Sequence, residues 1–162
     1  MNAQQAILAT LDLSTRVLTS YVGDLSDQEL MRRATGCNHL AWQLGHLIAT
    51  ENQFLDLLSP GSAIELPKRF AERHGRETTG DDDPSHFETK DRYLELLAEV
   101  HEATRQALLK TSAEQLDQPA PEALRGFCPT VGDVYVLIAT HGMMHAGQFV
   151  PVRRELGKPI VI

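Results

Sequence analysis

Three histidines have the spacing and the helical setting of metal ligands. His141 and His145 are four residues apart, so on a helix both imidazole rings project from the same face. His46 lies in a second, separate helical pattern. Imidazole is the commonest side-chain metal ligand, and three neutral imidazoles around a divalent ion leave coordination positions open for water or substrate. The pattern therefore favours a catalytic metal site over a structural one, but it does not name a substrate.

Four long segments with the apolar periodicity of helices must position these side chains. They cover about residues 3–21, 38–58, 85–110 and 131–156. Asn38 is expected to cap the second helix, and Ser85 with Glu88 has the spacing of a capping box for the third. A similar box, Ser26 with Glu29, opens a short helix. The remaining long stretch, residues 60–85, is expected to be a solvated crossover with a helical turn near residues 69–74.

The length of this crossover suggests a topology. About 26 residues can cross the full length of a helix bundle, so the second and third helices can run parallel. We therefore predict an all-α fold: one domain over residues 1–162, a four-helix bundle in up-down-down-up order with a long crossover between helices two and three. His46 then lies about 12 Å from the start of its helix, and His141 and His145 about 17 and 23 Å from the start of theirs. In antiparallel helices of about 33 to 40 Å these depths meet, and the three rings are expected to converge.

Composition and charge exclude several classes of function. The chain has 162 residues, 42% hydrophobic and 23% charged, as in a globular protein. Its net charge of −7 and the lack of a basic stripe argue against nucleic acid as a partner. No apolar run approaches the roughly 20 residues of a membrane span, and the N-terminus lacks the pattern of a signal peptide. The two cysteines, Cys37 and Cys128, form no CxxC motif, so we expect a cytoplasmic protein with reduced thiols.

The histidine segments are similar to those of one known family. Residues 36–47 resemble the G-x-N-x-x-x-W-x-L-G-H-L signature of the DinB-like (DinB/YfiT) proteins, and residues 141–148 resemble their H-x-x-x-H-x-G-Q run. Residues 154–157 fit the usual ending of the same helix. The motifs cover about 25 positions, and the helix order with its long crossover matches over the whole chain.

The resemblance implies a four-helix bundle that holds one divalent metal through His46, His141 and His145. Characterised relatives include thiol-dependent transferases and isomerases, while others have no known substrate. Family members are often dimers, so a homodimer is expected. Helical residues Leu8, Leu11 and Leu18 could supply an apolar patch for it, but the same residues suit the core.

Residues near the histidines have plainer interpretations. Trp42 is expected to pack in the core rather than to stack on a substrate. His39 is expected to be an exposed residue of the first helical turn rather than a residue at the pocket mouth. Gln148 could reach a group on the metal or make an ordinary interhelical hydrogen bond. Gly45 and Gly147 each cost about 1 kcal/mol in a helix interior relative to alanine, which is consistent with close helix approach or room for a metal.

Several other patterns point away from alternative sites. The zincin motif HExxH places a glutamate after its first histidine, where this chain has Gly142, so a zincin-like peptidase is not expected. Cys37 is interpreted as packing, and the acidic run 81–83 as a solvated loop. No role is assigned to the remaining histidines, which are His74, His86 and His101.

Three functions follow from the pattern. The first is a metal-dependent enzyme acting on a small molecule, as a thiol-dependent transferase or a hydrolase, with a low-molecular-weight thiol as the expected partner. The second is a non-catalytic metal-binding or stress-response protein with a vestigial or regulatory site, and the third is a structural bundle with histidines in its core. Three imidazoles accept zinc, nickel, iron, cobalt or copper, and zinc or nickel is expected first.

Overall fold

The computed structural model describes residues 1–160 and consists of helices and their connections. The long helices are α1 (Ala3–Val22), α3 (Leu40–Leu58), α5 (Lys90–Lys110) and α8 (Val131–Glu155). The short ones are α2 (Asp27–Leu30), α4 (Phe70–Arg73), α6 (Ala113–Leu116), α7 (Glu122–Arg125), and the 3₁₀ turns η1 (Arg76–Thr78) and η2 (Pro84–His86). Within residues 1–160 there is no strand, only one isolated bridge between Pro119 and Thr130. The predicted all-α class is confirmed.

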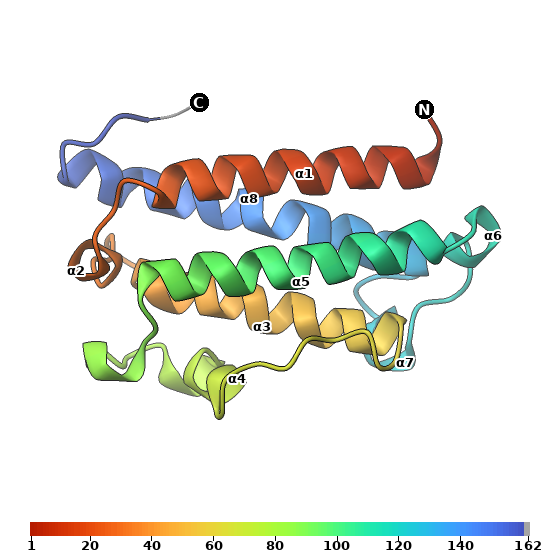
Figure 1. Ribbon diagram of the computed structural model, residues 1–162, viewed down its shortest axis with the longest axis horizontal. Helices are drawn as coiled ribbons and strands as arrows, with labels where there is room; N and C mark the ends of the chain where they lie inside the picture. Colours follow the sequence, from red (N-terminus) through yellow and green to blue (C-terminus); the bar gives the residue numbers. More distant parts are fainter. Residues whose placement is uncertain (161–162) are drawn as a thin grey trace.

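The long helices lie in pairs. Helix α1 packs along α8, and α3 packs along α5, with further contacts between α3 and α8 (Figure 1). The chain runs in one direction along α1 and α8 and in the opposite direction along α3 and α5. The two helices that carry the three histidines are therefore antiparallel neighbours.

Two helix starts differ from the sequence-based expectation. His39, not Asn38, caps α3, because its Nδ1 accepts a hydrogen bond from the Trp42 backbone N–H at 3.0 Å. Helix α5 begins at Lys90 with Thr89 as its cap, and the expected box at Ser85 is not formed. Asp83 instead accepts hydrogen bonds from Ser85 and fixes it in η2, after which the backbone is extended. The short helix α2 does begin with the predicted capping box.

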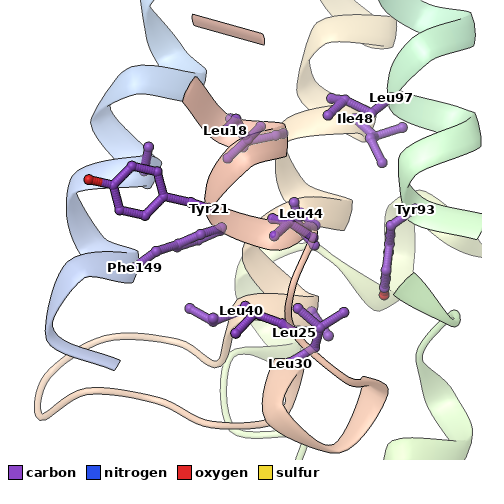
Figure 2. Close-up of a cluster of buried hydrophobic side chains, with 14 of the residues drawn as sticks. Leu18, Tyr21, Leu25, Leu30, Leu40, Leu44, Ile48, Tyr93, Leu97 and Phe149 are labelled. Carbon is purple, nitrogen blue, oxygen red and sulfur yellow. The ribbon is translucent and has the colours of Figure 1, made fainter. Parts of the chain in front are cut away.

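A large apolar cluster holds the helices together at the end of the molecule where α2 lies. Figure 2 shows part of it, with Leu44 of α3 among side chains from α1, α5 and α8. Leu11 and Leu18 of α1 are buried, at 2% and 1% exposure, so the core interpretation of these residues is right and the dimer-patch alternative for them is wrong. Burying a leucine side chain contributes on the order of 2 kcal/mol, so clusters of this size fix how the helices pack.

The crossover is anchored to the helices by a buried histidine. His74 follows α4, the helical turn expected near residues 69–74, and is only 2% exposed. Its Nδ1 lies 2.8 Å from the Phe70 carbonyl and its Nε2 lies 2.8 Å from the Tyr93 hydroxyl. Its ring also fills the space beside Gly45, where an added Cβ would come within 2.0 Å of it. His74 was assigned no role from the sequence; in the structure it fastens the crossover to α3 and α5.

No helix within residues 1–160 has both the length and the apolar character needed to cross a membrane.

The two glycines near the histidines should respond to substitution in opposite ways. Gly45→Ala should lower the free energy of unfolding by about 1 to 3 kcal/mol, because the new methyl group overlaps the fixed ring of His74. Gly147→Ala should raise it by up to about 1 kcal/mol, because no atom lies within 4 Å of the added Cβ and alanine favours the helix. Urea unfolding of both variants measures this. Equal effects would show that His74 is not held against Gly45. Of the two glycines, Gly45 has a close neighbour, which is the His74 ring of the crossover and not another helix, and Gly147 has none within 4 Å of an added Cβ.

Candidate metal centre

Three histidine rings converge between α3 and α8. The ring centroids of His46 and His141 are 5.4 Å apart, those of His46 and His145 5.5 Å, and those of His141 and His145 4.9 Å. One ring nitrogen from each can be chosen so that all three lie within 4.8 Å of one another. Such a cluster is positioned to hold one divalent ion, and its convergence follows the sequence-based expectation.

The local structure of α8 places its two histidines. Thr130 caps the helix in a capping box with Asp133, and the regular helix then puts His141 and His145 on one face. Beside His141, Gly142 allows close approach of α1: an added Cβ would lie 2.9 Å from the Ser14 hydroxyl. The absence of a side chain at Gly142 thus helps α1 to support the segment of α8 that carries the ligands.

A buried glutamine orients the ring of His145. Nδ1 of His145 lies 2.8 Å from Oε1 of Gln43, and the Gln43 amide nitrogen donates to the Asn38 carbonyl at 2.7 Å. Because the Gln43 amide nitrogen donates to Asn38, the Gln43 amide oxygen faces the His145 ring. This oxygen can only accept a hydrogen bond, so Nδ1 of His145 must carry the proton. The lone pair is then on Nε2, which can bind a metal. Hydrogen bonds of this kind fix the tautomer of metal-binding histidines and raise their basicity.

The ring of His46 is held between an aromatic side chain and the crossover. Trp42 stacks on it with centroids 4.9 Å apart and planes inclined by 7°. The indole Nε1 donates to the Thr78 hydroxyl at 3.2 Å, which fixes the indole from the crossover side. Trp42 is 5% exposed, so the predicted core packing is confirmed, and the same residue also forms one wall for His46.

Burial keeps the three rings in the neutral form that binds metals. Burial, together with the charge that the neighbouring imidazoles would carry, lowers the pKa of His145 to about 3 and that of His141 to about 4. Burial also lowers the pKa of His46, against a backbone hydrogen bond at His74 that raises it. At pH 7 all three are therefore unprotonated, and no proton has to be displaced before an ion binds. The donor set fits a divalent transition metal.

A pocket of about 540 Å³ opens beside the cluster. His46 lines one part of it, and the walls come from α3 and from the crossover. A volume in this range suits a small molecule. A much smaller cavity of about 10 Å³, roughly one water molecule, lies on another side of the cluster and is lined by His141 and Glu51.

Two polar groups near the centre were missed in the sequence. Gln43 lies three residues before His46 and hence on the same side of α3, which is the signal that could have identified it. Glu51 is buried at 5% exposure; one oxygen accepts a hydrogen bond from Thr104 at 2.7 Å, and the other lies 2.8 Å from Nδ1 of His101. A charged residue in the apolar pattern of α3 was the available signal for Glu51. His101, which was assigned no role, contacts this carboxylate.

One expectation at the centre is wrong. His39 is not an exposed first-turn residue: it is 0% exposed, because it caps α3 and the crossover covers it. Its Nε2 lies 3.0 Å from the Asp81 carbonyl, and its ring packs edge-on against Phe87.

Gln148 is half-buried, and the glutamine that is hydrogen-bonded to a ring of the cluster is Gln43. Cys37 packs against the large apolar cluster, as interpreted from the sequence.

Comparison with known proteins identifies the family. A model of the DinB superfamily matches residues 10–149, which is most of the chain and contains all three histidines. The chain belongs to the DinB superfamily. No curated protein and no solved structure matches it. Superfamily membership agrees with the resemblance seen in the two histidine segments, but it does not define a reaction.

The buried imidazoles predict how stability depends on pH. His145 has a pKa near 3 when folded and about 6.5 when unfolded, so between these values the unfolded chain binds more protons. The free energy of unfolding of the metal-free protein should therefore fall as the pH falls below about 6.5. From pH 6.5 to 5, one such group contributes a loss of about 2 kcal/mol.

Urea unfolding at several pH values, in the presence of a chelator, measures this loss. In His145→Gln the side chain does not titrate, so its loss between pH 6.5 and 5 should be smaller than that of the wild type by about 2 kcal/mol. The same pH dependence in both proteins would mean that His145 is not buried in its neutral form.

Proposed function

We propose that this chain is a metal-dependent enzyme that binds one divalent ion through His46, His141 and His145. It would act on a small molecule, as a thiol-dependent transferase or a hydrolase. The observation that carries the proposal is the convergence of three neutral imidazoles, with nitrogens within 4.8 Å of one another, next to a pocket of about 540 Å³. Zinc or nickel is the first choice of metal, and iron, cobalt or copper are compatible with the same ligands.

The residues around the cluster support a reactive centre. Gln43 presents Nε2 of His145, and Trp42 limits the movement of His46. A divalent ion held here supplies a positive charge that lowers the pKa of a thiol or of water, so that a nucleophilic anion is available near neutral pH. The pocket beside His46 gives a small molecule access to this part of the centre.

The proposal includes the setting of the site. It takes the chain as one domain over residues 1–162 in the up-down-down-up order, supported by the helix directions in Figure 1. It also includes a homodimer and a cytoplasmic location, which rest on the family resemblance and on the sequence pattern. A low-molecular-weight thiol remains the expected partner.

Metal binding should depend on each of the three histidines. The wild type, loaded with zinc or nickel and then dialysed, should retain about one ion per chain. His141→Ala and His145→Ala should lose most of it while keeping their helix content by circular dichroism. Elemental analysis measures the metal. His86→Ala, in the exposed part of the crossover, is the matched control and should retain it.

A variant that keeps all three histidines tests whether Gln43 orients His145 for metal binding. Gln43→Leu removes the acceptor for Nδ1 of His145 without removing a ligand, and should weaken metal binding by about 10-fold to 100-fold. Wild-type protein without stoichiometric metal after dialysis would refute the site. It would leave the third interpretation, a structural bundle with histidines in its core.

Thiol coordination distinguishes the enzyme from a closed metal-binding protein. In cobalt-loaded protein, the visible spectrum reports coordination number and thiolate ligation. Adding 2-mercaptoethanol should change the spectrum of the wild type and not that of His46→Ala, because an accessible ion accepts an exogenous ligand. A spectrum indifferent to thiols, halides and pH between about 6 and 9 would mean a closed site. The function would then be the non-catalytic, metal-binding alternative.

A further inference from the structure

The pocket beside His46 is an elongated groove along one face of α3. The α3 residues on its wall recur at helical spacing, at positions 46, 49, 50, 52, 53 and 56, so they share one side of the helix. From His46 to Asp56 this side extends about 15 Å. The opposite wall is the crossover, which runs along α3 in Figure 1. The apolar residues of the crossover that line the groove are Ala63, Leu66 and Ala71.

The two ends of the groove differ in charge. Arg76 is the one lysine or arginine among the described residues that line it. Arg76 follows His74 by two residues, and the His74 ring lies against Gly45, the neighbour of His46 in the chain. Asp56, the one acidic lining residue that the structure describes, is about three turns of α3 away from His46. Asp56 already accepts a hydrogen bond from the Gly61 backbone. The end of the groove beside the three histidines is therefore its positive end.

The Arg76 guanidinium is available to a ligand. The side chain is exposed, and within residues 1–160 no hydrogen bond or ion pair engages it. Arg69, on the same crossover, is paired with Glu72 at 2.8 Å. The chain as a whole carries a net charge of −7, so the positive charge of Arg76 is opposite in sign to the overall charge of the protein. Guanidinium groups bind carboxylates and related anions through two parallel hydrogen bonds.

We infer that the groove takes a small molecule with an anionic group, such as a carboxylate, which binds Arg76 while the reactive end reaches the cluster at His46. This inference rests on the proposed function and defines the chemical class of its substrate. The remainder of the molecule lies against the apolar residues of the crossover and hydrogen-bonds to Thr50 and Gln53 of α3. A neutral or cationic ligand of the same size makes no use of Arg76.

Three small thiols of similar length test the inference on cobalt-loaded protein. Mercaptoacetate is anionic, 2-mercaptoethanol is neutral and cysteamine is cationic; each is titrated while the visible spectrum is recorded. The wild type should bind mercaptoacetate more tightly than 2-mercaptoethanol, and cysteamine least tightly. In Arg76→Gln the ratio of the mercaptoacetate and 2-mercaptoethanol affinities should fall by about five-fold or more, the effect of one charge pair near a protein surface. The comparison of variants cancels the intrinsic difference in acidity between the thiols.

The controls separate the arginine from general electrostatics. Arg69→Gln removes the same charge from the crossover but does not line the groove, so the affinity ratio should stay at the wild-type value. Arg76→Gln should keep the metal content and the 2-mercaptoethanol affinity of the wild type. An unchanged ratio in Arg76→Gln, or an equal fall in both variants, overturns the inference and leaves the proposed function standing.

A metal-free measurement keeps the inference testable if no thiol binds. Trp42 is the single tryptophan of the chain and stacks on His46, so its fluorescence reports binding at this end of the groove. Acetate should change the fluorescence of the metal-free wild type with an affinity that falls about five-fold in Arg76→Gln and stays the same in Arg69→Gln. Acetate binding of this kind without any thiol response would support the anion site and exclude the thiol-dependent transferase form of the proposed function. Acetate binding that is absent, or independent of Arg76, would refute the anion site.

Discussion

The axial register between α3 and α8 is the constraint on which the centre depends. One turn of an α-helix rises 5.4 Å, so a slip of one turn would carry His46 away from the two histidines of α8 and out of reach of a shared ion. The register is held by apolar packing among the four long helices and by the hydrogen bond between Gln43 and His145 across the two helices. The same packing partly buries the imidazoles, which keeps them neutral. Position and protonation state of the ligands therefore have one common cause.

Much of this arrangement could be predicted because it depends on regular periodicity. Apart from the start of α5, the apolar pattern fixes the ends of the long helices to within about two residues, and four-residue spacing puts His141 and His145 on one face. The convergence of His46 with this pair followed from helix depth and direction, which depend only on the rise per residue and on the length of the crossover. The two histidine motifs supplied the family resemblance for the same reason, since they lie on the helices that form the centre.

The parts that could not be predicted depend on contacts of the crossover. From the sequence, His39 at a helix start and His74 in a loop would both be expected to be exposed. Both are buried, because His39 contacts Asp81 and His74 contacts Tyr93, which are distant in the sequence. The start of α5 was placed too early because Asp83 competes for Ser85, a local hydrogen bond that no periodicity reveals. Gln43 was overlooked because its partner His145 is 102 residues away. Irregular segments have no repeating pattern, so their contacts require the three-dimensional structure.

All three histidines come from α3 and α8, while α1 and α5 contribute only support. The residues that would hold the ion lie on two regular helices, whereas half of the residues that line the groove lie in the crossover, a connecting segment of the kind that tolerates insertion and exchange better than a helix does. Within residues 60–85, exchanges at the groove positions Ala63, Leu66 and Ala71 leave the centre in place, whereas exchanges at His74 or Thr78 remove contacts that support α3 and Trp42. An antiparallel helix pair with Gln43 and the three histidines is also a compact unit to transplant into a designed bundle.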